Sequence, residues 1–160
     1  MSLAEFDADL VVDARDCIMG RVATQVAEAA LDGQSVAVVN AERAVITGRE
    51  EQIKEKYKKR VDIGDDNQYF YPKRPDGILK RAVRGMVPHK QQRGREAFES
   101  IRVYVGNPYE EDSAGGSPRS GDGEAVEAEV LDGTSLDRLS NIRFVTLAEV
   151  SETLGANKTW

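Results

Sequence analysis

The chain has 160 residues, of which 40% are hydrophobic, and its net charge of −6, taken alone, argues against a nucleic-acid partner. No apolar run approaches the roughly 20 residues of a membrane span, and the acidic start of the chain lacks the features of a signal peptide. One cysteine, Cys17, can form neither an intrachain disulfide nor a zinc site alone. We therefore expect a single domain, residues 1–160, in a reducing, cytoplasmic setting.

The first third of the chain predicts two buried strands around a helix. Residues 10–12 are Leu-Val-Val, apolar residues recur at helical spacing between Met19 and Leu31, and Val36–Val39 is a second continuous apolar run. Strands that are apolar on both faces and alternate with helices are typical of a parallel sheet covered on both sides. The pattern therefore predicts an α/β fold.

A second helix is predicted after residue 47. Thr47 and Glu50 have the spacing of a capping box, which would start a helix with Ile53 and Tyr57 turned inward. Its outward face carries Lys54, Lys58 and Lys59. Residues 62–75 are rich in Gly, Asp, Asn and Pro, which indicates a loop.

Residues 76–86 give the sharpest amphipathic pattern in the chain. At about 100° per residue, one face is apolar and the opposite face is purely cationic. We expect the apolar face to enter the core and the helix to end at Pro88. The apolar face consists of Ile78, Leu79, Ala82, Val83 and Met86, and the cationic face of Lys80, Arg81 and Arg84.

The rest of the chain predicts shorter elements. Residues 93–100 fit a short helix with Ala97 and Phe98 inward, followed by a third strand at 101–105 and a last strand at 141–145. Thr146 and Glu149 form another capping box, which starts a final helix. Residues 110–129 are acidic and rich in Gly and Ser, which predicts a flexible surface insertion.

The charge is distributed unevenly. Residues 43–109 hold 16 Lys and Arg against 9 Asp and Glu, whereas the remainder holds 6 against 19. Chance clustering is one explanation, and the other is an acidic surface with one face kept cationic for a polyanion. The run from residue 80 to 95 favours the second, because it holds six cations and His89 but no acid that could pair with them. These cations are Lys80, Arg81, Arg84, Lys90, Arg93 and Arg95.

Two further signals are weaker. Arg15 and Arg21 flank the start of the first helix, where free N–H groups attract phosphate, although a plain strand–helix turn is an equal alternative. Tyr69 and Tyr71 lie beside Lys73 and Arg74 in the loop, where aromatic rings can stack on unpaired bases or pack onto the sheet. For the intervening Phe70 we expect packing.

Features of enzymes are missing from the sequence. It has no phosphate-binding glycine motif and no nucleophile elbow, and the lone His89 has no partner for catalysis or for zinc. We expect no metal, no cofactor and no small-molecule substrate. A small α/β enzyme that binds a nucleotide at the first strand–helix turn is therefore disfavoured.

Several segments in order resemble the thirteenth-protein family of the large ribosomal subunit, in its archaeal form. They are Asp13-Ala14, Gly20-Arg21, Asn40-Ala41-Glu42, Thr47-Gly48, Arg84-Gly85-Met86, Pro88-His89-Lys90, Gly94-Arg95 and Gly106-Asn107-Pro108. The resemblance implies a three-layer α/β/α fold with a central parallel sheet of about four strands. It also implies a structural protein, not an enzyme, that binds large-subunit ribosomal RNA, contacts neighbouring ribosomal proteins, and supports subunit assembly and translation.

By this resemblance, residues 84–90 lie in the RNA-contacting region, which is the region that charge alone selects. The full set of RNA-contacting candidates is Lys58, Lys59, Arg60, Lys73, Arg74, Lys80, Arg81, Arg84, His89, Lys90, Arg93 and Arg95, with Arg15, Arg21, Tyr69 and Tyr71 as weaker ones. An RNA-binding translational regulator that acts off the ribosome is the alternative function. The overall acidity resembles that of proteins from salt-loving archaea, in which salt screens distant like charges.

Overall fold

The computed structural model describes residues 6–63, 70–109 and 127–160. Its central element is a parallel sheet of β1 (Leu10–Asp13), β2 (Val36–Val39) and β4 (Ile101–Val103), in the order β1-β2-β4. Val11 pairs with Ala37, and Val38 pairs with Val103. All four side chains of the central strand β2 are fully buried, because both faces of the sheet are covered.

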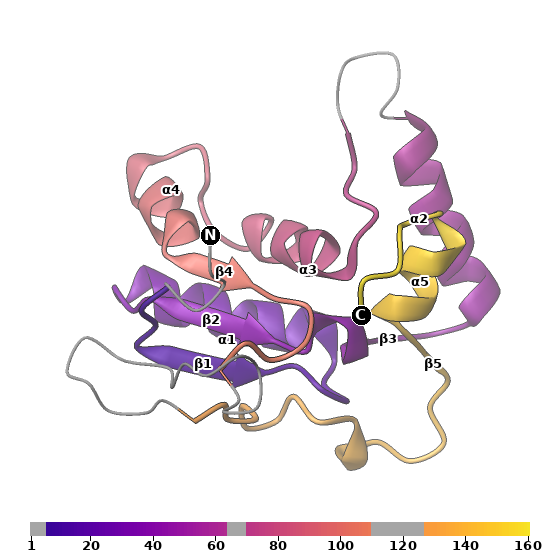
Figure 1. Ribbon diagram of the computed structural model, residues 1–160, viewed down its shortest axis with the longest axis horizontal. Coiled ribbons are helices and arrows are strands. Elements are labelled where there is room, and N and C mark those ends of the chain that lie inside the picture. The colour runs from indigo at the N-terminus through magenta and orange to yellow at the C-terminus, as the bar shows by residue number, and fades with distance from the viewer. Residues whose placement is uncertain (1–5, 64–69, 110–126) are drawn as a thin grey trace.

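The helices gather around this sheet (Figure 1). Helix α1 (Met19–Leu31) packs against α3 (Pro75–Arg84) and α4 (Gln92–Glu99), and α5 (Leu147–Thr153) packs against α3 and α2 (Glu50–Ile63). Short 3-10 helices occupy Ala41–Arg43 and Leu136–Arg138. The parallel sheet flanked by helices confirms the α/β class and is consistent with three layers.

The two faces of the sheet belong to separate apolar clusters. Val12, Val36 and Val38 point into the larger cluster, which they share with α1, α3 and α5. The alternate residues, such as Val11 and Ala37, point into a smaller cluster with Ala8 and Tyr109. Because successive side chains of a strand point to opposite faces, a strand buried on both faces must be apolar throughout, as the sequence indicated.

The number and pairing of strands differ from the expectation of about four parallel strands. The described parallel sheet has three, and β5 (Phe144–Thr146) pairs antiparallel with β3 (Val45–Thr47) in a second sheet. The expected capping box at Thr47 is wrong, because Thr47 belongs to β3 and α2 begins at Glu50. The capping box of Thr146 and Glu149 is confirmed in both of its hydrogen bonds.

The predicted flexible insertion at 110–129 lies for the most part, at residues 110–126, outside the described residues. Its end is part of the fold. The Asp13 N–H donates to the Glu129 carbonyl oxygen at 2.8 Å, and the Glu129 N–H donates to the Val11 carbonyl oxygen at 3.0 Å. Glu129 therefore forms a single parallel bridge beside β1.

Candidate nucleic-acid interface

Helix α3 has the two faces that its sequence predicts. Ile78, Leu79 and Val83 are fully buried, whereas Lys80, Arg81 and Arg84 remain partly exposed. The helix ends at Arg84 with Gly85 as its C-terminal cap, earlier than expected. Met86 therefore lies in the turn that follows, where it is 42% exposed, and its expected place in the core is wrong.

The turn between α3 and α4 is fixed by backbone contacts. The Met86 N–H donates to the Val83 carbonyl oxygen at 2.9 Å, and the Gln91 N–H donates to the Pro88 carbonyl oxygen at 2.9 Å. Gly94 of α4 packs directly on this turn, since a Cβ at that position would lie 2.1 Å from the Pro88 carbonyl oxygen. Only glycine allows an approach this close, so the turn and α4 form one rigid unit.

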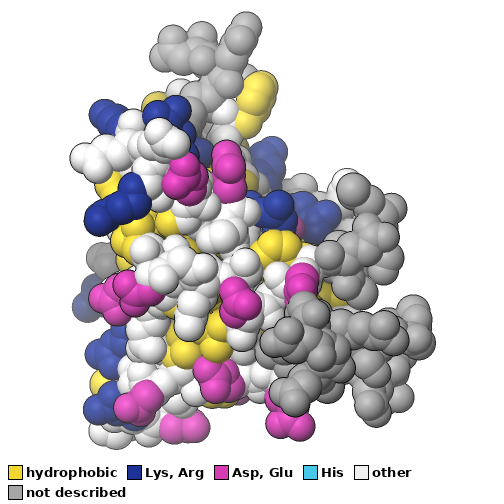
Figure 2. All heavy atoms as spheres, turned by 90° about the vertical axis from the view of Figure 1, so that its left-hand side faces the viewer, with side chains coloured by type: hydrophobic (Ala, Val, Ile, Leu, Met, Phe, Trp, Pro, Cys, Tyr) yellow, Lys and Arg dark blue, Asp and Glu magenta, His cyan; other side chains and the backbone are white. Residues whose placement is uncertain are grey.

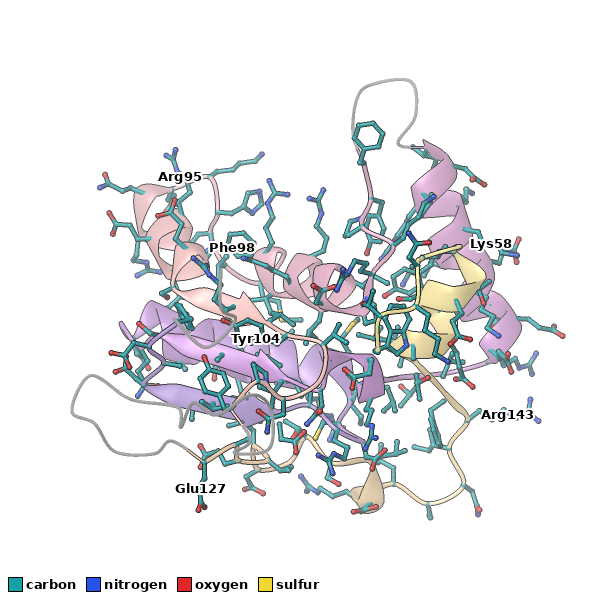
Figure 3. All side chains as sticks on the ribbon, in the orientation of Figure 1. Lys58, Arg95, Phe98, Tyr104, Glu127 and Arg143 are labelled. Carbon is teal, nitrogen blue, oxygen red and sulfur yellow. The ribbon has the colours of Figure 1, made fainter. Side chains whose placement is uncertain are left out.

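The cations of residues 80–95 stand on this unit. Lys90, Arg93 and Arg95 are exposed. Figure 3 shows nitrogen-tipped side chains standing above α3 and α4, on the side away from the sheet, with Arg95 at the outer end. We call this the α3–α4 surface and define it by Lys80, Arg81, Arg84, Lys90, Arg93 and Arg95.

Five cations of the α3–α4 surface, Lys80, Arg84, Lys90, Arg93 and Arg95, form no ion pair with a carboxylate of the described residues. Glu96 of α4 accepts a hydrogen bond from Gln92 Nε2 at 2.8 Å instead. From the α4 end of the molecule, basic and acidic side chains lie interspersed (Figure 2). Acidic side chains thus share this end of the molecule with the basic ones without forming ion pairs with these five cations in the described residues.

The electrostatics of the surface reflect the crowding of like charges. Burial lowers the pKa of Arg81, and the charge of Arg84 lowers it further. Burial likewise lowers the pKa of Lys80, helped by the charge of Arg102 on β4. Positive charges that repel one another at a partly desolvated surface favour the approach of an anion.

Two neighbours of Lys80 complete the surface. The Lys80 ammonium lies 5.0 Å from the centre of the Phe98 ring, which joins α3 to α4 by a cation–π contact. Arg102 is an exposed cation that sequence reasoning missed, although a single charge between the buried Ile101 and the partly buried Val103 was a signal for it. The surface therefore extends to the edge strand of the sheet.

The predicted residues of α2 form a second, separate group. Lys58 and Lys59 are exposed, and Figure 3 shows Lys58 on α2, away from α3 and α4. Arg60 lies over the ring of Tyr57 at 5.1 Å and over that of Tyr71 at 5.7 Å, and its Nη1 donates to the Tyr71 hydroxyl at 3.3 Å. Arg60 thus holds residues 70–74 against α2. We call α2 and residues 70–74 together the α2 arm.

The aromatic residues of the arm reverse one expectation. Tyr71 packs against the larger core cluster, with its ring 6.1 Å from that of Tyr57. Phe70, expected to pack onto the sheet, is 79% exposed, so that prediction is wrong. The physical reason is that neighbouring side chains of an extended segment point to opposite sides, and Tyr71 takes the inner one. Tyr69 lies outside the described residues.

Several other candidate RNA-binding cations already interact with groups of the protein itself. Arg74 Nε lies 3.2 Å from a carboxylate oxygen of Asp76, and Arg15 lies 3.8 Å from Asp13. Arg21 Nη1 donates to the Gly133 carbonyl oxygen at 3.0 Å. Lys73 is exposed and forms no such pair with the described residues.

Nothing in the described residues suggests other chemistry. His89 is partly exposed, with its backbone N–H bonded to the Val87 carbonyl oxygen at 2.8 Å. The part of the chain that the structure describes contains no group of three His, Cys, Asp or Glu side chains placed to hold a metal ion. None of its helices is long and apolar enough to cross a membrane.

Comparison with known proteins gives one consistent result. The family model described as "Ribosomal protein L13" matches residues 7–110. A protein of Haloarcula marismortui named "Large ribosomal subunit protein uL13" is 76% identical over 160 residues, which is 100% of both chains. Proteins with the same name are 64% identical over 160 residues, again 100% of both chains, in Natronomonas pharaonis, and 41% identical over 146 residues, 91% of this chain and 86% of the relative, in Methanopyrus kandleri.

Proposed function

The chain belongs to the ribosomal protein L13 family, and we propose that it holds large-subunit ribosomal RNA against its α3–α4 surface. It is a structural protein of the large ribosomal subunit, not an enzyme, and it acts in the ribosome. The expected kinship with proteins of salt-loving archaea is confirmed by the relatives from Haloarcula and Natronomonas.

One observation carries the assignment of the RNA to this surface. Six cations stand on α3, the turn and α4, and five of them, Lys80, Arg84, Lys90, Arg93 and Arg95, form no ion pair with a carboxylate of the described residues. RNA offers closely spaced phosphates, each of which can take a hydrogen-bonded Arg or Lys and release a counterion. A surface that holds several unpaired cations in fixed positions is suited to such a partner.

The rigidity of the unit suits binding in concentrated salt. At about 1 M salt the Debye length is only about 3 Å, so long-range attraction contributes little and contact geometry decides affinity. The backbone of the turn holds its cations in place before RNA arrives, which lowers the entropy lost on binding. The protein thereby contributes to the assembly of the subunit, next to neighbouring ribosomal proteins.

The test is a charge reversal at Arg84. Arg84→Glu is expected to leave the fold intact, to weaken binding to deproteinised large-subunit RNA, and to lower the slope of log affinity against log salt by about one phosphate contact. Filter binding over a range of KCl concentrations measures both. The control is Arg143→Glu, an equal charge change at an exposed residue away from the α3–α4 surface (Figure 3). Equal losses in the two variants would contradict the proposal.

Sedimentation separates this role from that of a regulator off the ribosome. The chain is expected to migrate with large subunits from a lysate and to stay with them through a salt wash. Recovery mainly in the ribosome-free fraction would contradict a structural role.

A further inference from the structure

Phe70 is the most exposed of the large hydrophobic side chains in the described residues, at 79%. Leaving a ring of this size in water forgoes the free energy of burying its apolar surface. The adjacent Tyr71 is packed against the core, so the exposure of Phe70 does not result from a segment that lacks contacts. A partner that covers the ring would recover this loss.

The position of Phe70 is fixed from the residues that follow it. Tyr71 is held by the Tyr57 ring and by the hydrogen bond from Arg60. Pro72 then packs on α3, since a Cβ on Gly77 would lie 2.7 Å from Pro72 Cβ. Proline also restricts the preceding residue to extended conformations, which keeps Phe70 and Tyr71 on opposite sides of the segment.

The elements that hold the ring carry mainly cations. Lys56, Lys59 and Arg60 line a hollow of about 390 Å³ along α2, together with Gln52, Glu55 and the 67% exposed Ile63. Lys73 is exposed three residues after Phe70, and Lys58 is exposed on α2. Glu55 and Asp62 of α2 form no ion pair with these cations in the described residues.

We propose that Phe70 stacks on an unpaired nucleobase of large-subunit RNA, whose flanking phosphates lie against the exposed cations of the α2 arm. This inference rests on the proposed function, and it assigns the arm a chemistry different from that of the α3–α4 surface. An exposed aromatic ring on an arm that carries several exposed cations matches a base with its phosphates, because every base has a π-face and carries a phosphate on each side. An apolar protein surface would match the ring but not the surrounding positive charge.

The first test uses a single tryptophan as a reporter. The chain has one tryptophan, Trp160, so Phe70→Trp in a Trp160→Phe background places the only indole at the proposed contact. Binding of deproteinised large-subunit RNA from Haloarcula marismortui is expected to quench its fluorescence, since a stacked base lies directly on the indole. Circular dichroism checks that both the parent and the variant are folded.

The matched control is Phe144→Trp in the same background. Phe144 is also exposed, at 47%, and lines a hollow with Gly48 and Arg49 at the start of α2. The 14 residues of α2 span about 20 Å, so this second indole lies at the other end of the helix from Phe70. Its emission is expected to change little on RNA binding. Equal quenching at both positions, or none at position 70, would overturn the proposal.

The second test compares affinities. Phe70→Ala is expected to weaken RNA binding by about five- to a hundredfold, and Phe70→Trp to keep it, because an aromatic ring is retained. Phe70→Leu is expected to bind as weakly as Phe70→Ala. If leucine restores the affinity, the contact is apolar and not stacked, and the proposal is wrong.

The outcomes distinguish this inference from the function on which it rests. If Arg84→Glu weakens RNA binding and Phe70→Ala does not, the α3–α4 surface keeps its role and Phe70 is not a stacking residue. In that case, poorer incorporation of Phe70→Ala into reconstituted subunits would identify a protein as the partner of the ring. If the unsubstituted chain fails to bind the RNA, both proposals are wrong.

Discussion

The α3–α4 surface and the α2 arm carry similar densities of Lys and Arg in the sequence, but the fold uses these charges differently. On the α3–α4 surface the backbone fixes the positions, through the turn and Gly94, and Lys80, Arg84, Lys90, Arg93 and Arg95 form no ion pairs with the described residues. In the arm, cations serve the structure: Arg60 holds two tyrosines, and Arg74 pairs with Asp76. The difference teaches that the number of charges in a segment does not equal the number available to a partner.

The largest expected effect concerns the stability of the protein and the apolar face of α3, which lies beneath the α3–α4 surface. Val83→Asp would bury an unpaired carboxylate at a position with no exposure and is expected to destabilise the protein by about 4 kcal/mol. Met86→Asp, three residues later, is expected to cost less than about 1 kcal/mol, because Met86 is 42% exposed. Urea denaturation measures both changes. Similar losses would show that Met86 belongs to the core after all.

A second test addresses the rigidity that distinguishes the α3–α4 surface from the arm. Gly94→Ala would place a Cβ against the Pro88 carbonyl oxygen and force the turn away from α4, with an expected cost of about 3 kcal/mol. The variant is also expected to bind RNA more weakly, because the cations of the turn and of α4 no longer keep their positions relative to one another.

The control for Gly94 is Gly20→Ala. Gly20 is in the first turn of α1, and no heavy atom would lie within 4 Å of an added Cβ. This change is expected to be neutral or slightly stabilising, because alanine favours the helix over glycine. Thermal unfolding compares the two variants. A Gly94→Ala protein as stable as Gly20→Ala would show that the turn adjusts freely.

The smallest expected effect is a difference in salt dependence between an unpaired cation of the α3–α4 surface and a paired cation of the arm. Lys90→Ala is expected to lower the slope of log affinity against log salt by about one phosphate contact. Arg74→Ala removes a cation that Asp76 already pairs, and its slope is expected to change by less than half as much. RNA binding measured at several KCl concentrations gives both slopes. A larger change for Arg74→Ala would mean that RNA displaces Asp76 from the arginine.

Local patterns predicted the elements whose causes lie within a few residues. The apolar spacing of α1, the two faces of α3 and the capping box of Thr146 and Glu149 all depend on contacts between neighbours in the chain. The cationic face of Lys80, Arg81 and Arg84 was predicted in the same way, since a helical face follows from the period of 3.6 residues.

The mistaken predictions concern features that depend on contacts between segments far apart in the sequence. Thr47 has the signature of a helix start, but pairing with Phe144 in the second sheet makes it part of β3. Phe70 and Tyr71 are both large aromatic residues, and only the presence of Tyr57 and Arg60 decides which ring turns inward. Arg102 adjoins the α3–α4 surface because β4 lies at the edge of the sheet, and the order of the strands depends on segments far apart in the chain.

The amino-acid sequence by itself determined the α/β class, the amphipathic helices and the stretch of chain that carries unopposed positive charge. Only the tertiary structure decided the pairing of β3 with β5, the exposure of Phe70 and Met86, and which cations remain free of partners in the described residues. The reason is physical: helix periodicity and capping depend on residues three or four apart, whereas strand pairing and side-chain burial depend on segments that only the folded chain brings together.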